Sequence, residues 1–176
     1  YPNKRKTYNM ASKTSTFDIV SVINMEEVNN AVNQSMMEIR QRFDFKNSKS
    51  SIILDKKESQ LTLISDNKPK LNSVIDILEG KLVKRKVSLK GLNYGKIEIT
   101  TGNTIRQNVI IQQGIPQEKA REIIKFIKGL RIKKIQSQIQ DDHLRITGES
   151  KDNLQKVIAK LKENDFKIAM TFTNYR

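Results

Sequence analysis

Apolar and polar positions along the chain follow two periodicities, which predict alternating strands and helices. In the first half, strands are predicted at 16–22, 51–54, 60–65 and 96–100. Apolar residues three or four positions apart predict two amphipathic helices between these strands. The first stripe comprises Val28, Val32, Met36, Ile39 and Phe43, and the second comprises Leu71, Val74, Ile75, Leu78 and Leu82. Asn24 is placed to cap the first helix, and the glycine-containing segment 91–95 predicts a loop.

The second half repeats this order of elements. Strands are predicted at 106–113, 134–140, 143–148 and 168–173, with the middle pair forming a hairpin across Asp141-Asp142. Two further helices are predicted, the second capped by Ser150. Their apolar stripes comprise Ala120, Ile123, Ile124, Ile127 and Leu130, and then Leu154, Val157, Ile158 and Leu161.

A repeat with an offset of 83 residues supports this correspondence. The residues Leu61, Leu63, Lys68, Leu71, Val74, Ile75 and Leu78 match Leu144, Ile146, Lys151, Leu154, Val157, Ile158 and Leu161. Both copies describe a strand, a tight turn and an amphipathic helix. A match at one fixed offset indicates an internal duplication, so we expect Leu71 and Leu154 to occupy equivalent buried positions.

Each half therefore reads βαββαβ, and the fold class is α+β, a tandem of two ferredoxin-like domains. We expect a first domain at 16–100 and a second at 104–176. Residues 1–15, which carry four basic side chains and no apolar run, are expected to form a flexible extension. The plan does not fix a function, because many unrelated proteins share it.

The formal net charge of +14 is the strongest indication of a partner. Basic residues concentrate at 81–96 and 119–134, which favours an anionic ligand such as nucleic acid or a phosphorylated molecule. We select Lys84, Arg85, Arg131, Lys133, Lys134 and Arg145 as candidate phosphate contacts. The competing interpretation is compositional bias, because lysine outnumbers arginine 24 to 9, as an A+T-rich genome would produce.

The sheet face away from the helices is a second candidate surface. In the second half, Gln136, Gln138 and Gln140 alternate with apolar or small residues, and Arg145 lies on the adjacent strand. Such amides and guanidinium groups can contact ribose, phosphate or base edges, and Gln138 is our candidate for base preference. A merely solvated polar face explains the pattern equally well. The corresponding face of the first half carries Ile53 and Ile64, which predicts that something covers it.

The usual signatures of catalysis are missing from the sequence. There is no cysteine, which fits a cytosolic protein, and His143 is the single histidine. Segment 91–96 resembles a phosphate-binding loop only in its glycines, since no helix is predicted after it. Asp141 and Asp142 could hold Mg²⁺ but are more typical of a solvated turn. We therefore expect no enzyme activity, cofactor or metal, and no run of residues is apolar enough to span a membrane.

Several segments resemble the YajQ family of bacterial proteins. These are Phe17–Ser21 (FDIVS), Arg42–Lys46 (RFDFK), Gln136–Gly148 (QSQIQDDHLRITG) and the ending Thr171–Arg176 (TFTNYR). The resemblance implies two ferredoxin-like domains that exchange strands 16–22 and 106–113. It also implies a cytosolic nucleotide-binding protein, with GTP, ATP, cyclic di-GMP or tRNA as possible ligands. The alternative is a regulatory adaptor that binds a protein such as a transcription factor, with a nucleotide such as cyclic di-GMP as effector.

Overall fold

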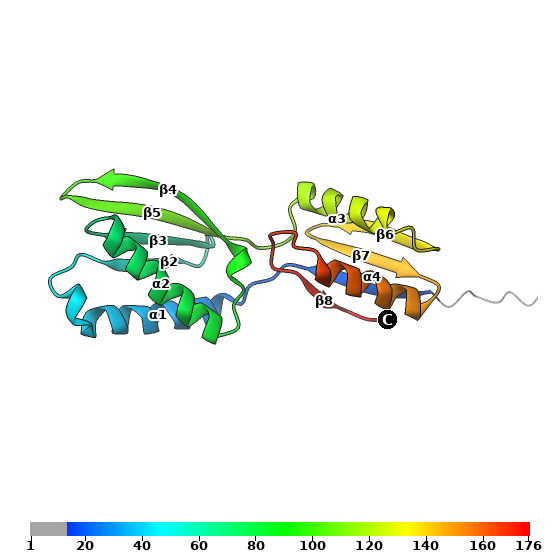
Figure 1. Ribbon diagram of the computed structural model, residues 1–176, viewed down its shortest axis with the longest axis horizontal. Helices are drawn as coiled ribbons and strands as arrows, with labels where there is room; N and C mark the ends of the chain where they lie inside the picture. Colours follow the sequence, from blue (N-terminus) through cyan, green and yellow to red (C-terminus); the bar gives the residue numbers. More distant parts are fainter. Residues whose placement is uncertain (1–13) are drawn as a thin grey trace, which may run out of the picture. The chain divides into compact units, whose positions relative to one another are not determined.

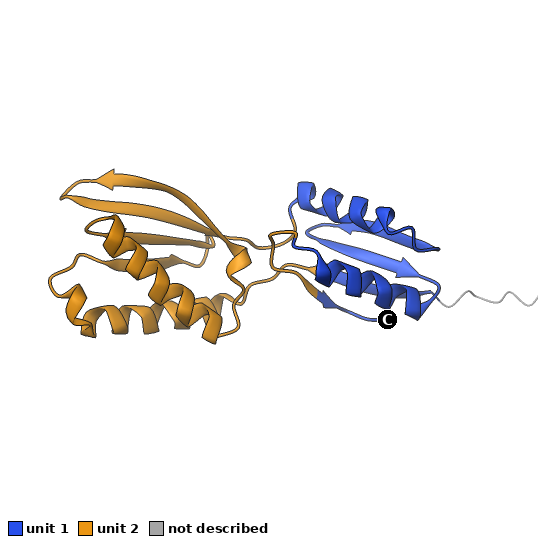
Figure 2. Cartoon of the chain, in the orientation of Figure 1, with its two compact units in different colours: residues 1–19, 116–165, 172–176 blue, residues 20–115, 166–171 orange. Residues whose placement is uncertain are grey.

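The computed structural model describes residues 14–176, which form two compact units. Unit 1 combines residues 14–19, 116–165 and 172–176, and unit 2 combines residues 20–115 and 166–171 (Figure 2). Each unit therefore draws on segments that are far apart in the sequence. No helix within residues 14–176 is long and apolar enough to cross a membrane.

Unit 2 is a four-stranded antiparallel sheet with two helices packed against it (Figure 1). The strands follow the order β2-β3-β5-β4. Their bounds are β2 (Ser51–Asp55), β3 (Gln60–Ser65), β4 (Leu92–Thr100) and β5 (Thr104–Ile111). The helices are α1 (Met25–Gln41) and α2 (Lys68–Lys84), with single turns of 3₁₀ helix at Phe43–Phe45 and Leu89–Gly91. The core between the layers includes Val28, Leu61, Leu63, Leu71 and Leu78, all fully buried.

Unit 1 has the same architecture. Its sheet follows the order β6-β7-β1-β8, and its helices are α3 (Gln117–Gly129) and α4 (Lys151–Glu163). The strands are β1 (Ser15–Val20), β6 (Ile135–Gln140), β7 (His143–Gly148) and β8 (Thr171–Thr173). Phe17, Ile19, Leu144 and Ile146 are fully buried and form the sheet's contribution to the core.

The two sheets exchange their central strands. β1 comes before every element of unit 2, yet it pairs with β7, with Phe17 opposite Ile146. On its other side, Thr16 exchanges two backbone hydrogen bonds with Arg176, of 2.9 and 3.0 Å. Conversely, β5 belongs to the second half of the sequence, yet it lies between β3 and β4 in the sheet of unit 2. The fold class is therefore confirmed: two ferredoxin-like units, each completed by a strand from the other half of the chain.

The 83-residue repeat is also confirmed in detail. β3 and β7 have the same length, the same burial pattern and bounds that differ by the repeat offset. The helices that follow start at equivalent residues, Lys68 and Lys151. Each is capped by a side chain at equivalent positions, Asn67 accepting from the Lys70 N–H and Ser150 from the Asn153 N–H. Leu71 and Leu154 are both buried, at 0% and 5% exposure.

The prediction that Phe43 completes the core stripe of α1 was wrong. The helix ends at Gln41, and Phe43 is 87% exposed, whereas Phe45 is buried. The chain leaves the helix at Arg42, whose extended backbone starts a 3₁₀ turn. The Arg42 guanidinium donates to both carboxylate oxygens of Asp44, at 3.0 and 2.8 Å. With the turn held by this Arg42–Asp44 ion pair, the Phe45 ring packs into the core and the Phe43 ring faces solvent.

Strand boundaries also differ from the sequence prediction, most of all at β4 and β8. Residues 92–95 are not a loop but the first part of β4, whose pairing with β5 shifts register between Tyr94 and Ile97. Gly95 makes this bulge possible, because an added Cβ would lie 3.0 Å from the Asn108 carbonyl oxygen. At the other end of the chain, β8 begins at Thr171 instead of residue 168, because Phe166 and Ile168 are buried in unit 2.

Candidate phosphate-binding surfaces

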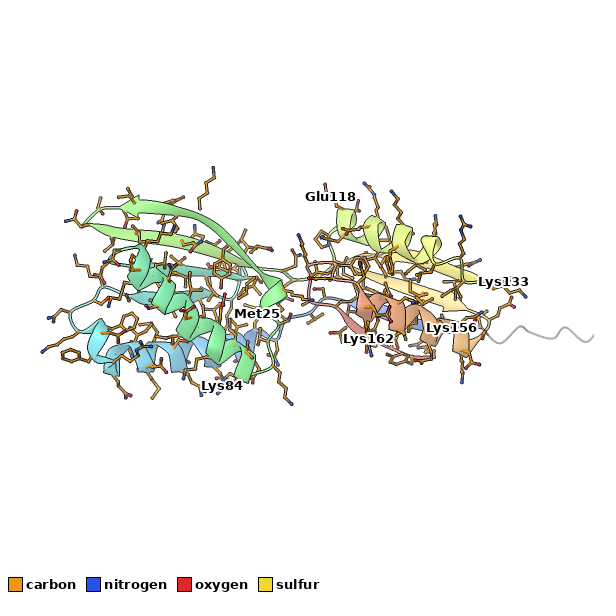
Figure 3. All side chains as sticks on the ribbon, viewed as in Figure 1. Met25, Lys84, Glu118, Lys133, Lys156 and Lys162 are labelled. Atoms are coloured by element: carbon orange, nitrogen blue, oxygen red, sulfur yellow. The ribbon has the colours of Figure 1, made fainter. Side chains whose placement is uncertain are left out.

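The seven candidate residues form three groups in two units. Lys84 and Arg85 lie at the end of α2 in unit 2. Arg131, Lys133 and Lys134 lie in the connection between α3 and β6 in unit 1. Gln138 and Arg145 lie opposite each other on β6 and β7, also in unit 1. Figure 3 labels Lys84 and Lys133, one from each unit.

At the end of α2, one unpaired lysine lies between two cations that are fixed by ion pairs. The Arg85 guanidinium donates to Glu27 at 2.9 Å and to Gln34 at 3.3 Å. The Lys81 ammonium lies 3.1 Å from Glu38, and its hydrogen bond holds the pKa of that carboxyl below its usual value. Lys84 has no hydrogen-bond or ion-pair partner within residues 14–176. Its charge is therefore available to an external anion.

Three shallow cavities adjoin one another along α1 and α2, and Lys84 lines all of them. Their volumes are about 260, 360 and 530 Å³. The first extends toward Arg42 and the third toward Arg85 and Lys86. Gln34, Met37 and Gln41 of α1 line the second. The groove thus combines amides, an apolar thioether, several cations and the carboxylates of Glu27, Glu38 and Asp76 on one helical surface.

Gly80 in the middle of α2 belongs to the wall of this groove. A Cβ added at Gly80 would meet no other atom within 4 Å, so packing inside the unit does not require glycine there. A glycine inside a helix costs about 1 kcal/mol relative to alanine. Its presence leaves the backbone beside Lys81 and Lys84 open to close approach by a ligand.

The connection between α3 and β6 presents a second set of cations. Arg131 and Lys134 both have positive φ angles, 54° and 58°, which make the chain turn tightly. Lys134 is held by Glu149 at 2.9 Å, and this hydrogen bond raises the pKa of the ammonium. The side chains of Arg131 and Lys133 have no partner within the described part of the chain. Beside them, a cavity of about 450 Å³ is lined by Lys128, Ile132 and Gln136, among others.

On the sheet face of unit 1 away from the helices, the guanidinium of Arg145 is already bound to a carboxylate of the same unit. Its guanidinium donates to Asp18 of the exchanged strand β1, at 3.0 and 3.4 Å. Asn174 donates to the same carboxylate at 2.9 Å. The hydrogen bond from Arg145, followed by that from Asn174, lowers the pKa of Asp18 against the opposing effect of burial. Gln138, opposite Arg145, accepts a hydrogen bond from Gln140 at 3.3 Å. A phosphate at Arg145 would therefore have to compete with Asp18.

Sequence reasoning missed the exposed ring of Phe43. The turn that carries it is held at several points: Arg42 binds Asp44, and the Lys70 ammonium donates to the Asp44 carbonyl. Both cations also lie over the buried Phe45 ring, at 5.4 and 4.9 Å from its centroid. The Phe43 ring thus projects into solvent from a turn that is held in place, and an exposed aromatic ring is a surface on which unpaired bases can stack. The two phenylalanines that flank Asp44 are the sequence feature that could have indicated this exposed ring.

The candidate catalytic and metal-binding residues lie on the hairpin between β6 and β7 of unit 1. His143 begins β7 and lies 3.4 Å from the exposed Asp142. Asp141 has a φ of 51° and forms the tight turn of the hairpin. Among residues 14–176 there is no group of three or more His, Asp or Glu side chains placed to hold a metal ion.

Comparison with known proteins gives matches over almost the whole chain. Residues 15–176 match the family described as "Nucleotide-binding protein YajQ-like". A nucleotide-binding protein of Desulfitobacterium hafniense is 54% identical over 165 residues, covering 94% of this chain and 99% of the relative. Similar proteins of the same description occur in Carboxydothermus hydrogenoformans (52% identity, 95% and 100% coverage) and Bacillus cytotoxicus (50% identity, 94% and 99% coverage).

Proposed function

Because the chain belongs to the YajQ-like family of nucleotide-binding proteins, we propose that it binds nucleotide or RNA phosphates through its basic surface, without catalysing a reaction on them. The α1/α2 groove of unit 2 is the principal site in this proposal. The connection between α3 and β6 contributes a second, separate contact. A cytosolic location remains an expectation from composition.

The observation that carries the proposal is the state of Lys84. Its ammonium lines three adjoining cavities and is unpaired within residues 14–176, while Lys81 and Arg85 beside it are held by carboxylates. Fixed ion pairs on both sides preorganise the groove without using the charge of Lys84. A phosphate oxygen can then bind Lys84 without first breaking an internal ion pair, which would cost desolvation and side-chain order.

Phe43 supplies a surface for the base. Stacking on an aromatic ring contributes about 1–3 kcal/mol per base and does not depend on base identity. An aromatic ring and an unpaired lysine on one unit would favour ligands that contain both a base and a phosphate over inorganic phosphate.

The test compares Lys84→Ala with Lys57→Ala. Lys57 is an equally charged, exposed residue in the turn between β2 and β3, and it lines none of the three cavities. Binding of GTP, ATP, cyclic di-GMP and tRNA is measured by calorimetry at several salt concentrations. We expect Lys84→Ala to lower the affinity for the bound ligand by about tenfold. If that ligand is tRNA, the salt slope should also fall by about 0.7–0.9, the contribution of one phosphate contact. If Lys84→Ala and Lys57→Ala change the affinity by the same amount, the groove is not the binding site.

The second candidate function is that of an adaptor for a protein partner, with a nucleotide such as cyclic di-GMP as effector. It is favoured by the open sheet face of unit 2, where Ile53 and Ile110 are 55% and 57% exposed. An apolar interface of this kind would bind with little salt dependence, in contrast to phosphate binding. Ile53→Lys would abolish partner binding while nucleotide affinity stays unchanged.

The non-catalytic part of the proposal rests on the surroundings of the titratable groups. Within residues 14–176, the Asp142 carboxylate, 3.4 Å away, is the hydrogen-bond partner of His143, at the end of the hairpin between β6 and β7. A general base needs a nucleophile or substrate proton within hydrogen-bond reach. We expect purified protein incubated with GTP or ATP to release no phosphate above background. Hydrolysis that His143→Ala abolishes would contradict this.

A further inference from the structure

Among residues 14–176, no strand pairs with the outer side of β4, the edge strand of unit 2, and this side is partly apolar. β4 is the last strand in the order β2-β3-β5-β4, and its seven consecutive residues 93–99 are exposed. Ile99 is 89% exposed and Ile97 is 41% exposed, on the same sheet face as Tyr94. Long edge strands with exposed apolar side chains are templates for pairing with another strand. Many proteins protect such edges with charges or bulges.

Both protective devices are present in β4, but neither blocks the whole strand. The bulge lies between Tyr94 and Ile97, so that pairing is regular from Ile97 to Thr100. Lys96 opposes the addition of a strand that offers no acid at the matching position. A strand that places a carboxylate opposite Lys96 would meet no such barrier. A second copy of β4 can do this, because its Glu98 lies two residues after Lys96 on the same face of the sheet.

We infer that unit 2 pairs with a second copy of this chain through antiparallel contact between the two β4 strands. A two-fold axis at Ile97 places Ile97 opposite its counterpart, and Lys96 of each copy opposite Glu98 of the other. Ile99 then faces the bulge at Gly95, where there is no side chain to obstruct it. Two unlike charge pairs and a central aliphatic pair each favour this alignment.

Charge selects this register over its neighbours. Because side chains alternate between faces, a register can slip only by even steps if both helical layers stay on one side. Moving the axis to residue 96 places Lys96 against Lys96, and moving it to residue 98 places Glu98 against Glu98. Both put like charges directly opposite each other, which is destabilising. The internal ion pair of Glu98 with Arg106, at 2.7 Å, does not prevent contact with Lys96, since a carboxylate accepts from two cations.

The resulting interface is isologous and small. One strand pair buries less than the roughly 1,200 Å² typical of stable complexes. We therefore expect dissociation constants of roughly 10–100 μM, in the range of weak transient contacts. Pairing of the two copies would join the sheets of two unit 2 domains into one continuous sheet. Their nucleotide-binding grooves, on the helical layer, would stay open.

The test uses two charge variants of the full chain in sedimentation velocity from 1 to 500 μM. Lys96→Glu and Glu98→Lys should each raise the dissociation constant at least tenfold, because like charges then face each other. An equimolar mixture of the two should form a heterodimer, since one copy then carries two acids and the other two lysines. The double exchange K96E/E98K should restore the homodimer. Circular dichroism of each variant reports folding, and restoration by mixing or by the double exchange shows that the effect is not a folding defect.

Three results would overturn the inference. The first is a monomer throughout the concentration range. The second is a dimer that both single variants leave intact. The third is a dimer that the control Ile53→Lys disrupts while Lys96→Glu does not, which would place the contact on the open sheet face instead. Hydrogen exchange adds an independent measure: amides of residues 97–99 should exchange more slowly at 500 μM than at 1 μM.

Discussion

Asp18 connects the exchanged strand to the rest of unit 1, so its replacement tests how the exchange is stabilised. The Asp18→Asn variant keeps the shape of the side chain but removes its charge. In the native protein the carboxylate accepts from Arg145 at 3.0 and 3.4 Å and from Asn174 at 2.9 Å. Asp18 itself is only 5% exposed, so these bonds replace water that the group has lost.

The expected loss in free energy of unfolding is about 1–2 kcal/mol at pH 7. Hydrogen bonds to a charged group contribute about 1.5–3 kcal/mol. We take the lower part of that range because the Arg145 side chain is 33% exposed and is partly screened by solvent. Asparagine can still accept one of the hydrogen bonds, which reduces the loss further. The control Asp142→Asn, at an exposed turn, should stay within about 0.5 kcal/mol of the parent protein.

The pH dependence of this difference is the decisive measurement. The native pKa of Asp18 is lowered from 3.8, so the unfolded state binds its proton first as the pH falls. The stabilisation is therefore fully present above the unfolded pKa and is lost as the pH falls through the lower native pKa. Urea unfolding followed by circular dichroism at pH 7, 5, 4 and 3 should show the gap between parent and Asp18→Asn closing only below about pH 4. A gap that is independent of pH, or absent at pH 7, would refute the assigned role of the carboxylate.

Five further variants test the packing and the groove. Phe43→Ala should change the free energy of unfolding by less than about 0.5 kcal/mol, whereas Phe45→Ala should cost about 3–5 kcal/mol; the reverse order would restore Phe43 to the core. Leu71→Ala and Leu154→Ala should each cost about 2–5 kcal/mol because both side chains are buried in equivalent positions, and a cost below 1 kcal/mol at either would contradict the repeat. Gly80→Ala should raise stability by about 0.5–1 kcal/mol while weakening nucleotide binding if the ligand approaches the α2 backbone; a gain in stability with unchanged affinity would separate Gly80 from the site.

The sequence predicted those features of the fold that depend on local patterns. The fixed offset between Leu71 and Leu154 identified the duplicated strand and helix because a strand and the helix after it are encoded by adjacent residues. The exchange of β1 and β5 is different, since alternation in 16–22 shows that a strand exists but not which sheet receives it. Only the family resemblance indicated the exchange. Phe43 was misplaced because its spacing continues the α1 stripe, and periodicity does not register the Arg42–Asp44 clamp that ends the helix.

The candidate site was harder to predict than the fold, because ion pairing depends on residues that are distant in sequence. Asp18 and Arg145 are 127 residues apart, and Glu27 and Arg85 are 58 apart. A count of basic residues treats Arg85, Lys134 and Arg145 as free cations, although each is held by a carboxylate. Lys84, Arg131 and Lys133 are the members of the predicted set that have no such partner within residues 14–176.

This difference changes the salt dependence expected of RNA binding. Each neutralised phosphate contributes about −0.7 to −0.9 to the slope of log K against log salt. Six contacts would give a slope near roughly −5, whereas the three unpaired cations give about −2 to −3. Lys133→Ala should make the slope less negative by about 0.7–0.9, the contribution of one phosphate contact. Lys134→Ala should have a smaller effect on the slope, because Glu149 already neutralises that ammonium. Removing a phosphate contact should weaken all RNA sequences equally. A slope near −5 that Arg85→Ala and Lys134→Ala reduce as much as Lys84→Ala would mean that RNA displaces the internal carboxylates. A slope near zero would mean that the net charge of +14 reflects composition alone, and the adaptor function would then be the better explanation.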